Sequence, residues 1–332
     1  MLLSRHTRRR EFIALVGGCA VAWPLAARAQ DAGPPVIGLL QSGTPSAYDL
    51  SGFRQGLKET GFIEGPNLKI EYRWANEDPD RLPELAADLV NRQVRVIAAV
   101  ASIEAARAAA TATNTIPIVF GVGGDPVALG LVGSINRPGG NVTGLTSMSG
   151  ELIGKQLAIL HDLLPQATRF GVLSNPQGWI HDSIVKDAQT AASTIGVTVE
   201  VLTASKRSEI DAVFAHLASD NRVQGLLVAN HPLFFSHRVQ LAILAARLAL
   251  PAISAFREMV NAGALMSYGP NFQDRDREQA HYVGRILKGE SPADLPVQQV
   301  SKFALAINVE TANAIGLTVP TKLLSTADEV IE

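Results

Sequence analysis

The sequence predicts an α/β protein built from two similar doubly wound units in tandem. From residue 36 onward, short runs rich in β-branched residues alternate with helical patterns. These runs are apolar on both faces, which is typical of parallel strands covered by helices on either side. Their spacing also repeats, because the first and third runs lie about 59 residues apart in one half and about 55 in the other.

In the first half, strands are expected at Val36–Leu40, Leu68–Trp74, Val94–Val100 and Ile116–Val122. Helices are expected between them near 47–60, 80–92 and 102–113. The second of these helices is introduced by Asp78-Pro79-Asp80, which combines an N-cap residue with first-turn residues.

The second half repeats this order. Strands are expected at Arg169–Asn175, Val197–Thr203, Gln224–Asn230 and Pro251–Phe256. Helices are expected at 181–195, 207–219 and 236–249. In both halves the second strand follows a helix that ends at a glycine, Gly61 or Gly196.

Further segments connect and follow these halves. Strands are expected at Val142–Thr146, Ala264–Gly269 and Phe303–Val309. Helices are expected at about 151–164 and 273–288, with a short one ending at Gly316.

Residues 1–29 are typical of an export signal. Arg8, Arg9 and Arg10 form a basic region, an apolar stretch follows from Phe12, and Ala27-Arg28-Ala29 places small residues at a cleavage site. Arg9-Arg10-Glu11-Phe12-Ile13 is similar to the twin-arginine motif. The apolar run is shorter than the roughly 20 residues that span a membrane. We therefore expect cleavage near Ala29 and a periplasmic protein; a lipobox ending at Cys19 is the alternative.

Cleavage changes the charge and removes the cysteine. The 332-residue chain carries 29 basic and 31 acidic side chains. Loss of five arginines and one glutamate leaves 24 and 30, so the formal net charge falls from −2 to −6. An acidic chain argues against nucleic acid as a partner, and a chain without cysteine suits an oxidising compartment.

Candidate binding residues lie where ligands bind in open α/β sheets, at the carboxyl ends of the strands and over helix N-termini. In the first half these are Gln41, Ser42, Gly43, Ser102, Ile103, Gly121, Gly123 and Asp125. In the second half they are Asn175, Asn230, His231 and Arg257. Aromatic residues also occur at strand ends and helix starts, and Trp74, Phe256 and Tyr268 are the ring candidates for a ligand cleft.

The sequence carries no pattern of an enzyme, a metal site or a nucleotide cofactor. Gly121–Pro126 lacks the lysine and serine of a phosphate loop. No Gly-x-Ser-x-Gly elbow occurs, and the histidines do not fall at metal-ligand spacing. We therefore expect a binding protein without catalytic residues, cofactor or metal.

Several runs resemble one known family. They include Phe53–Gly61, Tyr72-Arg73-Trp74, Ile116–Phe120, Asn136–Gly144, Met266–Gly269 and Gly284–Gly289. Together with the leader they are similar to substrate-binding components of ABC importers with a type I periplasmic-binding-protein fold. The run Asn-Arg-Pro-Gly-Gly-Asn-Val-Thr-Gly at 136–144 is the most specific of them.

The resemblance implies two Rossmann-like lobes joined by a hinge, with 36–145 plus 271–296 in lobe 1 and 146–270 plus 297–332 in lobe 2. It implies a monomer that captures a small polar solute, such as an amino acid or related carboxylate, for an inner-membrane permease and ATPase. Two ligand loops depart from the family, at Ala101-Ser102-Ile103 and at His231-Pro232. The alternatives are a solute sensor for a membrane kinase and a two-domain α/β enzyme of racemase type.

Overall fold

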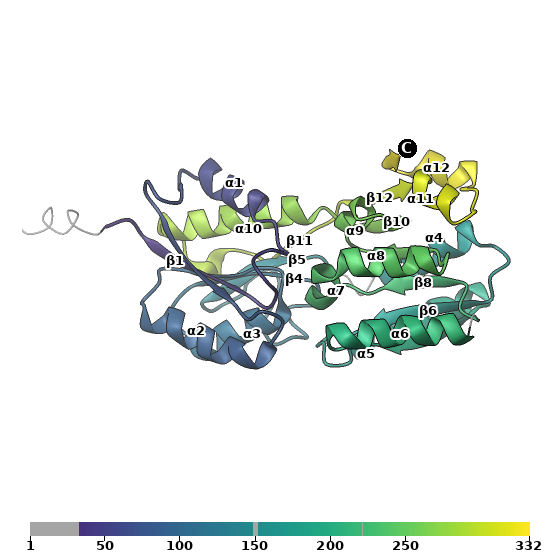
Figure 1. The fold of residues 1–332 in the computed structure, drawn as a ribbon. Coiled ribbons are helices and arrows are strands. Elements are labelled where there is room, and N and C mark those ends of the chain that lie inside the picture. Colours follow the sequence, from purple (N-terminus) through teal and green to yellow (C-terminus); the bar gives the residue numbers. More distant parts are fainter. Residues whose placement is uncertain (1–32, 149–151, 221) are drawn as a thin grey trace, which may run out of the picture.

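The computed structural model describes residues 33–148, 152–220 and 222–332. The predicted signal peptide, its cleavage site and Cys19 lie outside the described residues. In the described part the chain forms two lobes side by side, each with helices on both faces of a twisted sheet (Figure 1). The predicted fold class is confirmed.

The first sheet has the strand order β11-β5-β4-β3-β1-β2. Its strands are β1 (Val36–Gln41), β2 (Lys69–Trp74), β3 (Ile97–Ala99), β4 (Ile118–Val122), β5 (Val142–Thr146) and β11 (Gln298–Gln299). All adjacent pairs are parallel. From β1 the chain adds β2 on one side and then β3, β4 and β5 on the other, so the strand order reverses between β1 and β3. Such a reversal creates a crevice at the carboxyl ends of these two strands.

The second sheet has the order β13-β12-β10-β9-β8-β6-β7. Its strands are β6 (Arg169–Ser174), β7 (Thr198–Thr203), β8 (Gly225–Val228), β9 (Ala252–Ser254), β10 (Met266–Pro270), β12 (Phe303–Asn308) and β13 (Glu329–Ile331). β10 and β12 are antiparallel and the other pairs are parallel. The equivalent reversal lies between β6 and β8.

Helices cover both faces of the first sheet. On one face lie α1 (Ser51–Glu59) and α10 (Phe272–Leu287); on the other lie α2 (Leu82–Asn91), preceded by the 3-10 turn η1 (Pro79–Arg81), and α3 (Ile103–Ala112). α1 and α10 pack closely because Gly52 and Gly56 leave room for the backbone of Gln273 and Arg277. The burial of apolar side chains against both faces of the sheet stabilises this lobe.

The second sheet is covered in the same way. One face packs against α6 (Arg207–Asp220), α8 (Arg238–Arg247) and α9 (Arg257–Asn261). The other packs against α4 (Leu152–Leu163), α5 (His181–Ile195), α11 (Val309–Ala314) and α12 (Thr321–Thr326). α5 ends where Gly196 adopts a left-handed conformation at φ 77°, which glycine tolerates because it has no Cβ.

The chain passes between the sheets after β5, after β10 and after β11. β11 pairs with β5 in the first sheet, whereas the sequence-based division assigns residues from 297 onward to the second lobe. The helix expected over 236–249 is α8 (Arg238–Arg247), and a further short helix that was not expected, α7 (Pro232–Ser236), comes just before it. The short elements α9, α12, β11 and β13, with the 3-10 turn η3 (Pro292–Asp294), were not expected from the sequence.

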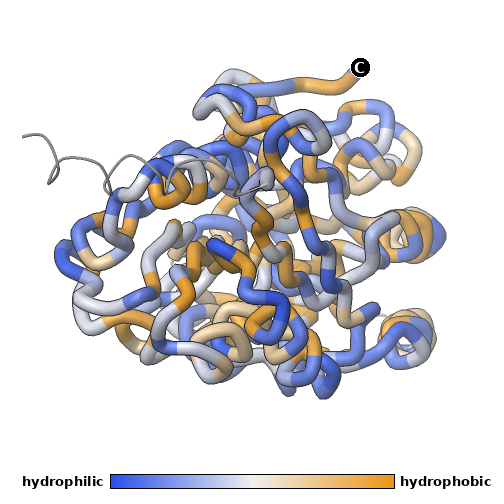
Figure 2. The backbone as a smooth tube through the Cα atoms, turned by 90° about the vertical axis from the view of Figure 1, so that its left-hand side faces the viewer, coloured by the Kyte–Doolittle hydropathy of each residue, from blue (hydrophilic) through white to orange (hydrophobic). Residues whose placement is uncertain are grey.

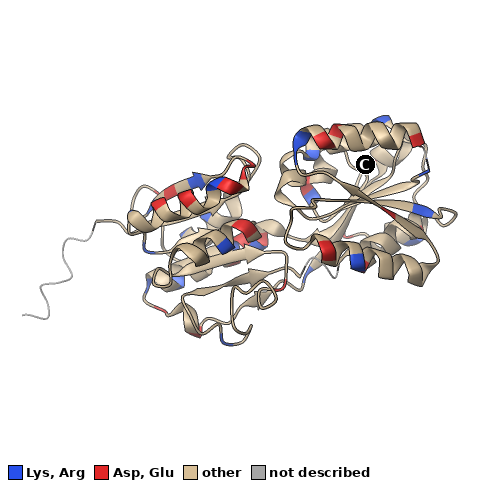
Figure 3. Cartoon of the chain, turned by 90° about the horizontal axis from the view of Figure 1, so that it is seen from below, with Lys and Arg blue, Asp and Glu red and all other residues tan. Residues whose placement is uncertain are grey.

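The distribution of side chains matches this layered arrangement. Peripheral helices alternate between hydrophilic and hydrophobic segments along the tube (Figure 2). Charged residues of both signs lie mainly on the helices and loops of the two lobes, while the strands carry few (Figure 3). No helix in the described ranges has the length and apolar character needed to cross a membrane.

Candidate functional site

A pocket of about 840 Å³, partly open to solvent, lies between the two lobes. Its walls come from the loops that follow β1 and β3 in one lobe and β6, β8 and β9 in the other, together with the first turn of α10. The crevices at the two reversals of strand order therefore face one another across the pocket. This is the position at which open α/β sheets bind ligands.

At one side of the pocket, helix α3 presents its N-terminus. Ser102 is the N-cap residue, and its Oγ accepts a hydrogen bond from Ala105 N at 3.0 Å. The first N–H groups of the helix have no acceptor within the helix and carry its positive dipole end, so they attract an anion such as a carboxylate. Ala101, just before the cap, has φ 54°, a conformation that costs a non-glycine residue about 1 kcal/mol or more.

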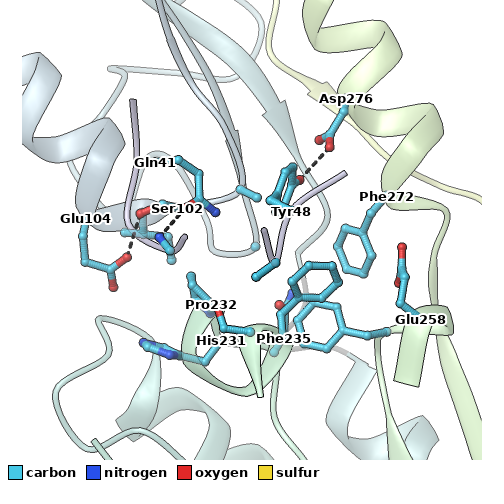
Figure 4. Close-up of a pocket in the computed structure, with 18 of the residues that line it drawn as sticks. Gln41, Tyr48, Ser102, Glu104, His231, Pro232, Phe235, Glu258, Phe272 and Asp276 are labelled. Atoms are coloured by element: carbon cyan, nitrogen blue, oxygen red, sulfur yellow. Dashed lines mark hydrogen bonds between the residues drawn. The ribbon is translucent and has the colours of Figure 1, made fainter. Parts of the chain in front are cut away.

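Acidic and amide groups lie beside this helix terminus. Glu104 Oε2 accepts a hydrogen bond from Ser102 Oγ at 3.0 Å, and Figure 4 shows Glu104, Ser102 and Gln41 on the same side of the pocket. Gln41 Oε1 accepts a hydrogen bond from Gly43 N, which fixes the turn after β1. The Glu104 carboxylate can bind an ammonium group, and the free N–H groups of α3 beside it can bind a carboxylate.

His231 closes this side from the second lobe. It is the N-cap of α7, and its Nδ1 accepts a hydrogen bond from Leu233 N at 3.2 Å. Burial lowers the pKa of His231 below its ordinary value, and the negative charge of Glu104 opposes that shift. The ring is therefore neutral near pH 7, with its proton on Nε2.

At the other side of the pocket, aromatic rings form a continuous apolar wall. The ring centroids of Phe235 and Phe256 lie 4.9 Å apart, those of Phe256 and Phe272 5.3 Å apart, and those of Tyr48 and Phe235 5.6 Å apart. Tyr48 and Phe272 belong to the first lobe, and Phe235 and Phe256 to the second. These tilted contacts are favourable for aromatic pairs, and they give the pocket an apolar end that both lobes build.

A buried charged cluster holds Tyr48 in place. The Tyr48 hydroxyl donates a hydrogen bond to Asp276 Oδ2 at 2.6 Å and accepts one from Arg275 at 3.0 Å. Arg275 also donates to Asp276 Oδ1 at 2.7 Å. Burial and the Asp276 carboxylate raise the pKa of Tyr48 well above its ordinary value, so the hydroxyl keeps its proton and remains the donor.

Glu258 also reaches the pocket, next to the aromatic rings (Figure 4). Its Oε2 is buried and accepts no hydrogen bond from any described residue. Burial raises the pKa of Glu258 above its usual range, and the Asp276 charge adds to this shift. A hydrogen bond from its own backbone N–H and the Arg238 and Arg275 guanidinium groups oppose it.

A second, more polar cavity of about 1020 Å³, including open space, adjoins the first and shares Gly43, Glu104, Trp179, His231 and Pro232 with it. Its other walls include Ser42, Glu77, Asp80, Asn175, Gln177 and Ser205. Its acidic groups make this part of the cleft unfavourable for an unpaired anion.

Contacts across the cleft hold the lobes near one another. His237 Nε2 of the second lobe pairs with Glu77 Oε2 of the first at 3.0 Å. The Arg107 guanidinium of the first lobe lies 3.8 Å from the centre of the Trp179 ring of the second, a favourable cation–π arrangement. These contacts join the two lobes beside the pocket.

The structure brings most of the predicted site residues together. The larger group lines the main pocket: Gln41, Gly43, Ser102, Ile103, Gly123, Asn230, His231 and Phe256. Ser42 and Asn175 line the adjoining cavity. Asn175 Nδ2 lies 3.5 Å from Nδ1 of His231, so it also supports the rim of the main pocket.

Five predicted residues lie outside both of these cavities. Trp74 packs at the end of the edge strand β2, in the core next to α1 and α10. Gly121 lies in β4 against Gln279 and Arg275. Asp125 accepts hydrogen bonds from Val127 N and Ala128 N within its own turn.

The other two are Arg257 and Tyr268. Arg257 points away from the cleft and pairs with Glu329 of β13. Tyr268 lies in β10, and its ring centroid is 6.2 Å from that of Phe303. β10 is two strands away from β8, where the order reverses, so its residues do not reach the ligand crevice.

The predicted site residues leave out much of the lining: Tyr48, Asp49, Glu104, Trp179, Phe235, Glu258, Phe272, Arg275 and Asp276. Of these, Glu104 and Glu258 stand in loops that the sequence places at strand ends. The sequence feature that points to Tyr48, Trp179 and Phe235 as pocket residues is their position beside strand ends and helix starts. Phe272, Arg275 and Asp276 lie on α10, which follows β10 of the second sheet but packs on the first, and no local pattern places them at the pocket.

Among the described residues, Glu200, His216 and Asp220 are close enough to hold a metal ion. They lie on β7 and α6, away from the pocket lining. Arg169 lies 3.2 Å from Glu200, and Arg222 lies 2.5 Å from Asp220. These guanidinium groups already balance the acidic charge, so the group does not favour a cation.

Comparison with known proteins agrees with this architecture. A family model described as ABC transporter substrate binding protein matches residues 42–331. The chain is 28% identical to a tyrosine-binding protein of Clostridioides difficile over 266 residues, which are 80% of this chain and 76% of that protein.

Two solved structures are also similar. A domain from Streptococcus pneumoniae in complex with L-Trp is 26% identical, with a TM-score of 0.79 and coverage of 89% of this chain and 100% of that one. A ligand-free, open substrate-binding protein with adhesive properties from Clostridium difficile is 27% identical, with a TM-score of 0.64 and coverage of 90% and 99%. The TM-score is therefore higher with the L-Trp complex than with the open structure.

Proposed function

The chain belongs to the ABC transporter substrate-binding protein family, and on that basis we propose that it captures an amino acid with an aromatic side chain between its two lobes. The observation that carries the proposal is the division of the pocket. One side offers the N-terminus of α3 and the Glu104 carboxylate, and the other offers the rings of Tyr48, Phe235 and Phe272.

The polar side matches the ends of a zwitterion. The ligand carboxylate would accept hydrogen bonds from the first N–H groups of α3, and its ammonium would lie against Glu104. The surplus of acidic groups in the pocket and the adjoining cavity disfavours a carboxylate that lacks an amine.

The apolar side matches an aromatic ring. Stacked or edge contacts with Phe235, Phe256 and Phe272 would bury the ring of the ligand. The tyrosine-binding relative and the L-Trp complex support this ligand class.

We further propose that the protein is exported through the signal peptide at residues 1–29 and acts in the periplasm as a monomer. The closed, loaded form would deliver its ligand to a membrane permease driven by a cytoplasmic ATPase, as the family description implies.

A thermal-shift panel tests the proposed ligand class. We expect L-tyrosine, L-tryptophan or L-phenylalanine to raise the melting temperature, because a ligand that binds only the folded state stabilises it. Sugars, polyols and purines serve as controls and leave it unchanged. A shift produced by one of these controls, with none from the aromatic amino acids, would refute the proposed ligand class.

A further inference from the structure

We propose that Glu258 determines which aromatic ligands are bound, by accepting a hydrogen bond from a donor on the ring, such as a phenol O–H or an indole N–H. This inference rests on the proposed function. Glu258 lies away from the polar side of the pocket, and it would distinguish ligand rings that carry a hydrogen-bond donor from rings that do not.

The position of Glu258 is fixed by the sequence around it. It lies in the first turn of α9, whose N-cap residue is Phe256, shortly after the end of β9. Phe256 and Phe272 pack against each other, and Figure 4 shows the Glu258 carboxyl beside Phe272, on the opposite side of the pocket from Glu104. A ligand whose carboxylate is bound at α3 would direct its ring toward Glu258.

Glu258 differs from the other acidic residues that line the pocket. Asp49 accepts hydrogen bonds from Ser51, Glu104 accepts one from Ser102, and Asp276 accepts from Tyr48 and Arg275. Oε2 of Glu258 is buried without a donor from any described residue. A buried acceptor without a partner is unfavourable, so a ligand that supplies a donor gains affinity.

The neighbouring guanidinium groups do not supply that donor. Arg275 is bound to Asp276 and Tyr48. Arg238 donates to the carbonyl oxygens of Ala47 and Phe235, at 3.2 and 3.0 Å. Both nevertheless act on Glu258 through their charge. The negative charge of Asp276 opposes their effect.

Calorimetric titration of the full mature chain with L-tyrosine and L-phenylalanine, which differ only in the phenol O–H, tests the inference. We expect the wild-type protein to bind L-tyrosine at least about 10-fold more tightly, because a polar site rejects an analogue that lacks its donor. Glu258→Ala should reduce this preference to about twofold or less, through weaker binding of L-tyrosine. L-Tryptophan and its 1-methyl derivative provide the same comparison for the indole N–H.

Glu84→Ala is the matched control, because Glu84 is an exposed acidic residue of α2 away from the pocket; it should keep the wild-type preference. Circular dichroism establishes that Glu258→Ala folds. If it does not fold, Glu258→Gln takes its place, since an amide carbonyl accepts a weaker hydrogen bond than a carboxylate and should lower the preference partly.

The outcomes separate this inference from the proposed function. If no aromatic amino acid binds the wild-type protein, the proposed function fails. If both ligands bind but neither Glu258 variant changes their ratio, Glu258 does not read the ring donor and the inference is wrong. Tighter binding of L-lysine than of L-tyrosine by the wild-type protein would also overturn it, because Glu258 would then pair with a cation.

Discussion

Tyr48 contributes to the pocket through both ends of its side chain. Its ring packs against Phe235 of the opposite lobe, and its hydroxyl links Asp276 and Arg275 on α10. The hydroxyl thus fixes the ring that lies at the boundary between the lobes.

Replacement Tyr48→Phe should destabilise the protein by about 1–3 kcal/mol, because a buried carboxylate loses a hydrogen-bond donor. Urea denaturation measures the change. Tyr72→Phe is the matched control, since the Tyr72 hydroxyl contacts Glu64 in an exposed hydrogen bond and its loss should cost about 0.5 kcal/mol or less. Equal costs for the two variants would show that the Tyr48 cluster does not stabilise the fold as described.

For individual residues, the sequence predicted the polar lining of the pocket better than its aromatic lining. Ser102 and His231 follow strands at the two reversals of strand order and cap helices, and both features can be recognised in a sequence. Trp74 and Tyr268 also end or occupy strands, but their strands lie away from the reversals. Strand order, which places each strand end near or far from the crevice, is a long-range property that local patterns do not contain.

Helices α1 and α10 connect distant parts of the chain next to the pocket. Glu59 at the end of α1 accepts hydrogen bonds from Arg277 at 2.8 Å and from His281 at 2.7 Å, both on α10. The hydrogen bond from Arg277, with those from Gln55 and His281, lowers the pKa of Glu59 to about 2. The first turn of α10 carries Phe272, so this packing also positions the aromatic wall.

The lowered pKa of Glu59 gives a pH dependence with a defined sign. The stabilisation is fully present above the ordinary pKa of 4.5 and is lost as the pH falls toward 2, because the unfolded chain takes up the proton first. Glu59→Gln should therefore melt at a lower temperature than wild type at pH 7, and the difference should shrink below pH 4.5. Melting curves from pH 2 to 7 measure it, with Glu84→Gln as control; a difference that stays constant with pH would contradict the account.

The elements themselves were predictable to a large extent. Buried strands such as β1 and β4 are short apolar runs, and Gly61 and Gly196 mark helix ends by left-handed φ values of 92° and 77°. Helix α7 was not predicted, because its five residues are too few to show a helical period. α9 and β13 were missed because elements of five residues or fewer carry too little periodicity.

In the whole molecule, side chains from helices and loops of the two lobes meet across the pocket. The His237–Glu77 pair and the Arg107–Trp179 contact involve residues of the cleft walls, since Trp179 lines both cavities and Glu77 lines the adjoining one. A ligand that binds with the lobes in this arrangement gains from contacts that stabilise it.

His237→Ala should weaken ligand binding about two- to fivefold, the range expected for a partly exposed side-chain hydrogen bond. A double-mutant cycle with Glu77→Gln isolates the pair, and Kd from calorimetry is the readout. His216→Ala is the control, since His216 pairs with Glu200 within the second lobe. Additive effects of the two cleft variants would show that the pair does not couple the lobes.

The most direct test of the central claim is calorimetric titration of the mature protein with L-tyrosine and L-tryptophan at several temperatures. We predict binding of one ligand per chain with a negative heat-capacity change, because closure buries the ring of the ligand against Phe235, Phe256 and Phe272. Folded protein that binds neither amino acid, but binds a sugar or a polyol, would contradict the claim.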